Sequence, residues 1–270
     1  QEFKNNVSNS NHEFFFNDVN ELDITKKKEI LDYVTIYKIQ LIINCAAYTN
    51  VNKSETYKNL AIKVNSDAVK NLIEVCEEKK LKMIHFSTDY VYNSNNMTPI
   101  REDSNINPVN YYGISKREGE KIIEKSSSNS IIIRTSWLYS KYGINFVKTM
   151  IKKGENEKKV YVINDQFGCP TYSKDLVECT LSMIDSNNFN KNKTYNFSNE
   201  GYTNWYELTK KIFELKKIKC EVVPVDSNQY KNIAIRPKFS ITDKSRIKDI
   251  FNISIRRWDE ALEEFIINYK

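Results

Sequence analysis

The stretch that decides the fold is Met83-Ile84-His85-Phe86-Ser87-Thr88-Asp89, a short, largely apolar run that ends in polar residues. Apolar runs of this length are typical of strands that are buried on both faces, as in a parallel sheet. Three further runs have the same character and are predicted to be strands: Phe14-Phe15-Phe16, Leu41-Ile42-Ile43 and Ile131-Ile132-Ile133.

Helical patterns lie between these runs. Leu60, Val64, Ala68, Leu72 and Cys76 recur at every fourth position, as on one face of a helix. Further helices are predicted over residues 25–38, 112–125 and 146–153. Because strands and helices alternate, we predict an α/β fold with a doubly wound parallel sheet of the Rossmann type.

The pattern changes after residue 150. Strands are expected at residues 160–163 and 194–197, and helices at 173–184, 205–216 and 257–269, whereas 217–256 reads as irregular. We therefore predict a dinucleotide-binding domain of residues 1–150 plus about 173–198. A smaller C-terminal α/β substrate lobe would comprise residues 151–172 plus 199–270.

Composition narrows the class of protein. The 270 residues carry a net charge of +6, and no stretch approaches the ~20 apolar residues that cross a bilayer. No signal peptide is visible at the polar start, and no membrane partner is expected. The basic residues form no stripe with interleaved aromatics, which disfavours nucleic acid, although a mild positive field suits phosphate-bearing ligands. Five scattered cysteines without a C-x-x-C pair suggest neither a disulfide framework nor a zinc site, and they fit a reduced, cytoplasmic setting.

A dinucleotide-binding sheet is expected to open with a strand and a Gly-rich turn, whose backbone N–H groups approach the pyrophosphate. None of the six glycines forms a G-x-G pair, and the chain begins in what reads as the first helix. Either the true amino terminus precedes Gln1, or the protein holds a dinucleotide in another way. The first explanation is preferred.

The predicted chemistry lies in Tyr112-Gly113-Ile114-Ser115-Lys116, with Thr88 upstream. Positions i and i+4 share a helical face, and a Lys ammonium beside a phenol lowers the phenol pKa from about 10. Such a Tyr can donate a proton to a developing alkoxide, while Thr88 hydrogen-bonds the same oxygen. The sequence thus predicts a site for carbonyl reduction.

The Tyr-x-x-x-Lys spacing by itself carries little weight. With 17 Tyr and 34 Lys among 270 residues, chance predicts about two matches, and two occur, at Tyr112/Lys116 and Tyr206/Lys210. Only Tyr112 follows a strand that ends in Ser-Thr and a loop that contains Pro108. Tyr206 and Lys210 are therefore expected to be partly buried surface.

Several blocks, in order along the whole chain, together resemble the dTDP-4-dehydrorhamnose reductase family of extended short-chain dehydrogenases. The blocks are residues 21–25 (ELDIT), 44–55 (NCAAYTNVNKSE), 87–92 (STDYVY), 107–108 (NP), 112–116 (YGISK), 134–139 (RTSWLY), 145–150 (NFVKTM), 165–171 (DQFGCPT) and 236–237 (RP). Each is weak alone and specific in combination. In the family, a first strand and a Gly-Gln-Leu-Gly turn, about fifteen residues in all, would directly precede Gln1.

The resemblance implies NADPH or NADH as cofactor. Asp23 and Ile24 would contact adenine, Asp18 could accept the adenine ribose hydroxyls, and Lys116 would hold the nicotinamide ribose. The full implied set of cofactor-binding residues is Asp18, Asp23, Ile24, Ala46, Ala47, Tyr48, Asn65, Tyr112 and Lys116. Mg²⁺ is implied only because some members contain it, and no ligand residues are assigned.

The implied substrate-binding residues are Thr88, Asp89, Tyr90, Trp137, Asn145, Gln166, Thr171 and Arg236. Trp137 would pack on the sugar, although such a residue is more often core. Arg236 suits a diphosphate through its planar fork. Gln166 and Thr171 could equally belong to a structural turn that ends at Pro170.

Two positions depart from the family pattern. Cys45 stands where Ala is usual, a small change. Asn52 stands where Asp is usual, which removes a charge near the cofactor loop and is expected to alter local hydrogen bonding or metal affinity. His85 is expected to be a core-facing strand residue without a ligand role.

The resemblance implies reduction of the C4 keto group of dTDP-6-deoxy-L-lyxo-4-hexulose to dTDP-L-rhamnose, with Thr88, Tyr112 and Lys116 as catalytic residues and a homodimer as a possible assembly. A related 4,6-dehydratase would need Thr-Asp-Glu where this chain has Thr88-Asp89-Tyr90. Two alternatives stay open. The chain could reduce another nucleotide-linked 4-keto sugar, or it could be a cofactor-binding regulatory subunit resembling that of methionine adenosyltransferase.

Overall fold

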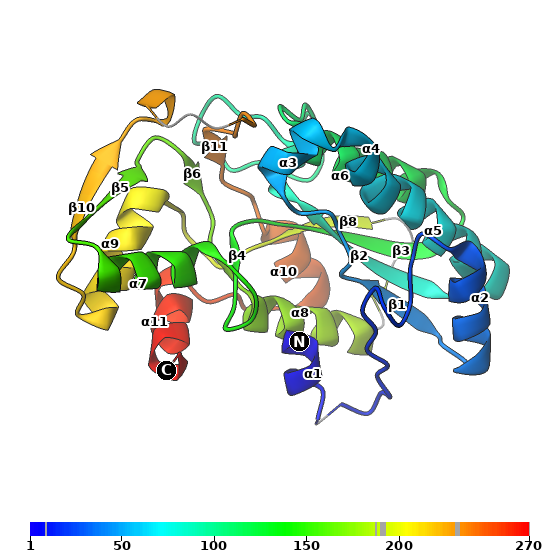
Figure 1. Cartoon of the computed structure of the whole chain (residues 1–270). Coiled ribbons are helices and arrows are strands. Elements are labelled where there is room, and N and C mark those ends of the chain that lie inside the picture. Colours follow the sequence, from blue (N-terminus) through cyan, green and yellow to red (C-terminus); the bar gives the residue numbers. More distant parts are fainter. Residues whose placement is uncertain (9, 187, 190–192, 230–232, 270) are drawn as a thin grey trace.

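The computed structural model describes the chain except residues 9, 187, 190–192, 230–232 and 270. It has a larger and a smaller lobe that lie side by side (Figure 1). The larger lobe is built on a four-stranded parallel sheet in the order β1-β2-β3-β8. Its strands are β1 (Leu41–Asn44), β2 (Lys82–Thr88), β3 (Asn129–Thr135) and β8 (Lys193–Phe197).

Helices cover both faces of this sheet, because successive side chains of a buried strand point to opposite sides. Met83 and Ile132 pack under α2 (Lys27–Ile36), α5 (Ala68–Lys79) and α6 (Tyr111–Lys125). Ile84, Ile131 and Ile133 pack on α8 (Ser173–Asp185) and α10 (Ser245–Phe251). The predicted doubly wound α/β sheet is thereby confirmed.

The predicted helical ladder between residues 60 and 76 is not one regular α-helix. It begins in α4 (Lys58–Ile62), passes through a π-helical turn, η1 (Lys63–Asp67), and continues as α5. The short α3 (Val51–Thr56) precedes it. Single π-turns inside helices are frequent at functional sites, and this one faces α6.

The smaller lobe surrounds a two-stranded parallel sheet of β5 (Lys159–Ile163) and β10 (Glu221–Val225). Around it pack α7 (Phe146–Asn156), α9 (Trp205–Lys216) and α11 (Trp258–Asn268). The expectation that residues 217–256 are irregular is wrong, because β10 and α10 lie there. Pro224 fits inside β10 because this strand pairs with β5 alone, so a missing N–H can face away from the ladder.

The side chains of α7 belong to the core of the smaller lobe, although α7 starts before residue 150. This packing favours a division slightly earlier than the one the sequence suggests, and the exact domain limits stay a prediction. The remaining short elements are η2 (Asp89–Val91), β4 (Leu138–Tyr139), β6 (Phe167–Gly168), β7 (Thr171–Tyr172), β9 (Thr203–Asn204), η3 (Ser227–Gln229) and β11 (Phe239–Ser240).

The prediction of a strand at residues 14–16 is wrong. The first element is α1 (Glu2–Asn6), which packs against α8, and the described residues between α1 and α2 form no helix or strand (Figure 1). The ring centroids of Phe14 and Phe16 lie 6.1 Å apart and those of Phe15 and Tyr37 lie 5.0 Å apart, so these residues make ring contacts without strand pairing. Among the described helices, none has the length and apolar character to span a membrane.

Candidate active site

Helix α6 begins near the carboxyl end of β2, and its start is fixed by several contacts. Asn110 caps it, because the side-chain Oδ1 accepts the backbone N–H of Gly113 at 2.9 Å. The Glu55 carboxylate accepts the N–H of Tyr111 at 2.7 Å, where the helix dipole favours an anion. A Cβ at position 113 would overlap the Tyr90 carbonyl, so this close approach requires glycine.

The Tyr112 phenol, half-buried on the first turn of α6, meets the end of β2. Thr88 hydrogen-bonds Tyr112, and the Tyr90 ring lies edge-on to it with centroids 5.8 Å apart. Burial raises the pKa of Tyr112 to about 12, so the phenol holds its proton near neutral pH. The structure therefore brings together two of the three residues expected to act on a carbonyl.

Lys116 does not bind the phenol. Its Nζ donates to the Phe86 carbonyl at 2.7 Å and lies 3.2 Å from Nε2 of His85, and Tyr112 is not among its hydrogen-bond partners in the described part of the chain. The Lys116 side chain is 1% exposed, and burial lowers its pKa to about 8. The expected lowering of the Tyr112 pKa by Lys116 is wrong for this structure, since burial of the phenol has the larger effect.

The loop after β1 is held by two asparagines. Asn44 Oδ1 accepts the N–H of Ala46 at 3.1 Å. Asn65, on the π-helical turn, accepts the N–H of Tyr48 at 2.8 Å and donates to its carbonyl at 3.0 Å. Asn65 is 1% exposed, so it supports the loop from behind. Ala46 is exposed and Ala47 partly so, at the carboxyl end of the strand, where ligands of open α/β sheets bind.

The other predicted cofactor residues lie before α2. Asp23 accepts the N–H of Thr25 at 2.9 Å, and this bond lowers the pKa of its carboxyl. Ile24 packs on the core beneath α5, and its carbonyl accepts a hydrogen bond from Asn71 at 3.2 Å. Asp18 lies in an exposed turn rather than at the end of a strand.

Besides Thr88, the predicted substrate residues Asp89 and Tyr90 lie near Tyr112, and Arg236 lies near Tyr90. Asp89 is 2% exposed, and burial raises the pKa of its carboxyl to about 7. Burial raises the pKa of Tyr90, while the charge of nearby Arg236 opposes that rise. The buried Nε of Arg236 has no hydrogen-bond partner among the described residues. Because an unsatisfied buried donor is costly, this atom is well suited to a ligand.

The segment that carries Arg236 is held by two asparagines of the larger lobe. Asn110 donates to the Ile235 carbonyl at 2.8 Å, and Asn52 accepts the N–H of Ala234 at 3.4 Å. Asn52 is the position at which the family pattern has Asp. Its amide oxygen makes a bond that a carboxylate oxygen could also make, so the departure keeps this connection.

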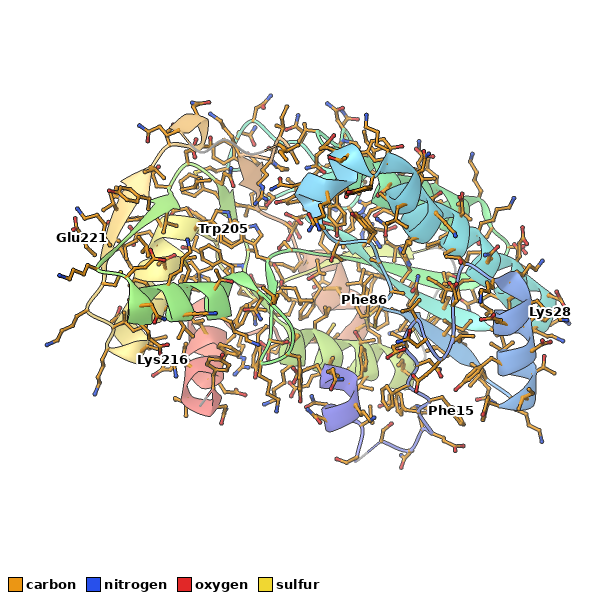
Figure 2. All side chains as sticks on the ribbon, viewed as in Figure 1. Phe15, Lys28, Phe86, Trp205, Lys216 and Glu221 are labelled. Atoms are coloured by element: carbon orange, nitrogen blue, oxygen red, sulfur yellow. The ribbon has the colours of Figure 1, made fainter. Side chains whose placement is uncertain are left out.

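Trp137 stacks on Trp205 with ring centroids 3.4 Å apart and planes 8° apart, and both pack against the core of the smaller lobe, where Figure 2 labels Trp205. The backbone of Trp137 is left-handed, with φ 46°, which is uncommon for a large residue. A Cβ at Gly168 would overlap its ring. These contacts favour a core role, and packing on a sugar stays a prediction.

The other three predicted substrate residues, Asn145, Thr171 and Gln166, are capping or buried residues in this structure. The Asn145 amide caps α7, with Oδ1 accepting a backbone N–H at 3.1 Å and Nδ2 donating to a carbonyl at 2.6 Å. Thr171 is 0% exposed and its hydroxyl accepts a bond from Thr135 at 3.3 Å, which favours the structural-turn alternative. Gln166 is buried beside β6.

The second Tyr-x-x-x-Lys match behaves as expected of surface. Lys210 is exposed, binds Glu207 at 3.1 Å and lies 5.2 Å from the centroid of the half-buried Tyr206 ring. The same spacing thus gives an exposed, paired lysine on α9 and a buried one on α6.

Sequence reasoning missed the role of His85. It lies in the middle of β2, opposite Asn44 of β1, and both side chains are buried. Their side chains approach at 3.0 Å between His85 Nδ1 and Asn44 Nδ2. Two polar residues in otherwise apolar strands were the available signal, because parallel pairing can bring them together.

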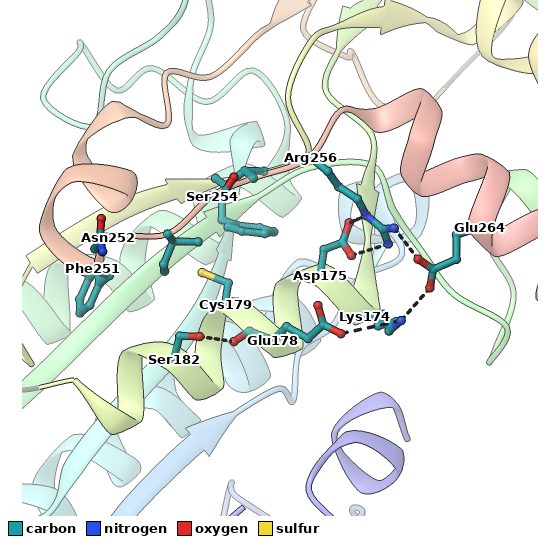
Figure 3. Close-up of a pocket in the computed structure, with 13 residues that line it drawn as sticks. Lys174, Asp175, Glu178, Cys179, Ser182, Phe251, Asn252, Ser254, Arg256 and Glu264 are labelled. Carbon is teal, nitrogen blue, oxygen red and sulfur yellow. Dashed lines mark hydrogen bonds and ion pairs between the residues drawn. The ribbon is translucent and has the colours of Figure 1, made fainter. Parts of the chain in front are cut away.

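A separate pocket of about 460 Å³ lies along α8, away from Tyr112 (Figure 3). The charged side chains at its rim form ion pairs with one another. Arg256 binds Asp175 at 2.7 Å and also Glu264, and Lys174 binds Glu264 at 2.7 Å. Paired charges of this kind explain the rim as a structural network, and the candidate active site stays at the junction of β2 and α6.

Mg²⁺ receives no support from the donor groups. Within the described ranges, no three His, Cys, Asp or Glu side chains gather as a metal site requires. All five cysteines are free thiols, and four of them are buried.

Comparison with known proteins is consistent with this site. The family model described as the RmlD substrate binding domain matches residues 1–270. A dTDP-4-dehydrorhamnose reductase from Aggregatibacter actinomycetemcomitans is 34% identical and covers 95% of this chain and 90% of its own length. A dTDP-4-dehydrorhamnose reductase from Escherichia coli is 30% identical over 90% of this chain and 84% of its own.

Solved structures agree with these relatives. A dTDP-4-dehydrorhamnose reductase from Clostridium acetobutylicum superposes with a TM-score of 0.94 at 34% identity, covering 99% of this chain and 94% of its own. One from Bacillus anthracis, in complex with NADP, has a TM-score of 0.94 at 34% identity, covering 98% and 94%. With its fold, its Thr88–Tyr112 pair and these likenesses, the chain belongs to the dTDP-4-dehydrorhamnose reductase family.

Proposed function

We propose that this protein reduces the C4 keto group of dTDP-6-deoxy-L-lyxo-4-hexulose to give dTDP-L-rhamnose, a precursor for cell-surface polysaccharides, and that it uses NADPH or NADH. The observation that carries the proposal is the hydrogen bond between Thr88 and a protonated Tyr112 at the carboxyl end of β2. Reductase names among the relatives favour catalysis over the regulatory-subunit alternative.

Tyr112 is the proton donor in this proposal. Thr88 Oγ1 donates to Asp89 Oδ1 at 3.2 Å and accepts the N–H of Tyr90 at 3.2 Å, and its contact with Tyr112 eases the loss of the phenol proton. A keto oxygen placed between Thr88 and Tyr112 would take over that proton as negative charge develops on it. The raised Tyr112 pKa suits an acid, because the proton is present at neutral pH and leaves only for a strongly basic alkoxide.

The nicotinamide cofactor supplies the hydride when bound. The exposed backbone at Ala46 and Ala47, held by Asn44 and Asn65, fits a dinucleotide that runs along the carboxyl ends of the strands. The complex of the Bacillus anthracis relative with NADP supports NADPH, and Asp18 as a ribose contact for NADH stays a prediction.

Arg236 is the proposed diphosphate contact. Its unpartnered Nε and its place beside Tyr90 leave a charged donor near the reacting end of the cleft. A guanidinium can bind two phosphate oxygens at once through its planar fork. Trp137 as a sugar platform, a homodimer and a cytoplasmic location are further predictions from the sequence.

The test is consumption of NADPH and NADH by the purified protein with a panel of nucleotide-linked 4-keto sugars. We expect turnover with the dTDP-linked 6-deoxy sugar, and a loss of about 100-fold or more in kcat for Tyr112→Phe. Tyr206→Phe, the matched change at the other Tyr-x-x-x-Lys, should keep wild-type activity. Cofactor binding without turnover on any sugar would instead identify a regulatory subunit.

A further inference from the structure

Behind the active site, three buried polar side chains form a row that ends at Lys116. Lys116 Nζ lies 3.2 Å from His85 Nε2, and His85 Nδ1 lies 3.0 Å from Asn44 Nδ2. Their exposed fractions are 1% for Lys116, 0% for His85 and 4% for Asn44. Water cannot reach these groups freely, so each donor needs an acceptor within the row.

The direction of the hydrogen bonds in this row is set by one backbone group. The N–H of Ala46 can only donate, and it donates to Asn44 Oδ1 at 3.1 Å. This bond turns the Asn44 amide nitrogen, a donor, toward His85 Nδ1, which must therefore accept. A neutral imidazole that accepts at Nδ1 carries its proton on Nε2, and that N–H points at Lys116.

An N–H that points at Lys116 needs a lone pair there, and only the neutral amine has one. The amine can accept from His85 and still donate to the Phe86 carbonyl at 2.7 Å. A charged ammonium would instead need His85 Nε2 as an acceptor. The proton of His85 would then sit on Nδ1, and Asn44 would have to rotate its amide and give up Ala46.

The charges around Lys116 fix neither the neutral amine nor the ammonium. The groups that face Lys116 are Cys45 from the loop after β1, His85 from β2 and Glu120 from α6. Glu120 is bound by Arg134 at 2.8 Å, so much of its charge is already neutralised. Burial is the main reason that the Lys116 pKa falls to about 8, and burial also holds the His85 pKa well below its usual value, so the imidazole stays neutral.

We propose that Asn44 and His85 are positioning residues that hold Lys116 against the Phe86 carbonyl and couple its protonation to the tautomer of His85. The Nε2–H tautomer accompanies the neutral amine, and the Nδ1–H tautomer accompanies the ammonium. This inference deepens the proposed reductase function, in which Lys116 would contact the cofactor ribose. A change of tautomer would mark the step at which Lys116 becomes charged and free to turn toward its ligand.

The tautomer can be read directly, because the chain has only two histidines. Nitrogen NMR of ¹⁵N-histidine-labelled His12→Gln protein, without cofactor, isolates His85 and distinguishes Nδ1–H from Nε2–H. The ¹³Cε shift of Lys116, assigned by its loss in Lys116→Met, reports the charge of the amine over the same pH range. We expect a single shared midpoint at which the tautomer changes, and no tautomer change in Lys116→Met.

Asn44→Asp provides the opposing variant. A carboxylate only accepts, so it should fix the proton of His85 on Nδ1 and raise the Lys116 midpoint by about one pH unit or more. Asn44→Leu, of similar size, should remove the preference for either tautomer. The proposal is overturned if an Nε2–H imidazole coexists with a charged Lys116, or if Asn44→Asp leaves the tautomer unchanged.

Activity gives an independent readout. In the reductase assay, His85→Leu should lower kcat by about 10-fold and shift its pH profile, with little change in the KM for the sugar. His85→Gln, which can still bond Lys116, should recover part of the rate. If the wild-type protein shows no turnover at all, the proposed function fails, while the NMR result still decides the coupling.

Discussion

Two buried cations, Arg134 on β3 and Lys116 on α6, are each 1% exposed and differ completely in their partners. Arg134 binds both oxygens of Glu120 at 2.8 Å, Tyr92 at 2.6 Å and the Glu102 carbonyl at 3.0 Å. Among the described residues, the hydrogen-bond partners of Lys116 are the neutral groups of Phe86 and His85. The buried charge of Arg134 is compensated by the Glu120 carboxylate, whereas the buried amine of Lys116 has neutral hydrogen-bond partners and a lowered pKa.

This difference separates buried ionisable groups that stabilise the fold from those that can take part in function. Burial alone would raise the pKa of Glu120, yet the bonds from Arg134 outweigh it and leave that pKa lowered, so the pair is charged and fixed. Burial lowers the pKa of Lys116, and the charge of Glu120 opposes that shift only in part. A buried ionisable group without a counter-charge is the one whose state a ligand can change.

The largest effect is expected from breaking the compensated pair. Arg134→Met would leave the Glu120 carboxylate buried with Arg117 as its remaining ionic partner. We expect a loss of about 3–5 kcal/mol in the free energy of unfolding, measured as a lower urea midpoint at an unchanged slope. The double variant Arg134→Met with Glu120→Gln should recover part of this loss, and a loss below about 1 kcal/mol would contradict the interpretation.

The matching substitution at Lys116 should lower activity and leave stability almost unchanged. Lys116→Met is expected to lower kcat/KM by about 100-fold while the free energy of unfolding stays within about 1 kcal/mol of wild type. Methionine fills the space of the lysine stem and leaves no buried amine to desolvate. A loss of stability as large as that of Arg134→Met would remove the distinction between the two cations.

Lys116 should also make stability depend on pH. Its folded pKa of about 8 lies below its usual 10.5, so the unfolded chain binds more protons between these values. Stability from this group is therefore gained as pH rises through the window and lost as pH falls. Between pH 8 and pH 10.5, the free energy of unfolding of the wild type, measured in urea, should rise by about 1–3 kcal/mol relative to that of Lys116→Met. A difference that does not change with pH would argue against a buried amine with a lowered pKa.

The smallest effect is expected at the second Tyr-x-x-x-Lys. Lys210→Met removes an exposed lysine that pairs with Glu207, and exposed pairs of this kind contribute little. The change in free energy of unfolding should stay within about 0.5 kcal/mol, with unaltered kcat. Equal consequences at positions 116 and 210 would mean that spacing, rather than burial, determines the role.

The sequence predicts the architecture well where periodicity is strong. The runs at Leu41, Met83 and Ile131 become adjacent parallel strands, and the helices at Ser173 and Trp205 begin at the predicted residues. Residues 14–16 show the limit, because an apolar run becomes a strand only when a neighbour pairs with it. Likewise, Pro224 reads as irregular until its position on a strand paired on one side is known.

The sequence predicts which residues form the candidate active site, but it does not predict the contacts that they make. The order of blocks identifies Thr88, Tyr112 and Lys116, but a sequence does not show which atom a flexible lysine binds. The direction of the Lys116 side chain depends on His85 and Asn44, which lie 31 and 72 residues away along the chain. Similarly, Thr171 and Asn145 are in matching blocks, yet the Thr171 hydroxyl accepts a bond from Thr135 and the Asn145 amide caps α7.

The two glycines of α6 have an evolutionary consequence. Gly113 lies against the Tyr90 carbonyl and Gly119 against that of Asn65, so the helix is wedged at two points where no side chain fits. Substitution of either glycine would therefore displace α6 and, with it, the proton donor Tyr112. The segment that carries Arg236 is held by two side-chain amides instead, those of Asn110 and Asn52, which other residues could replace.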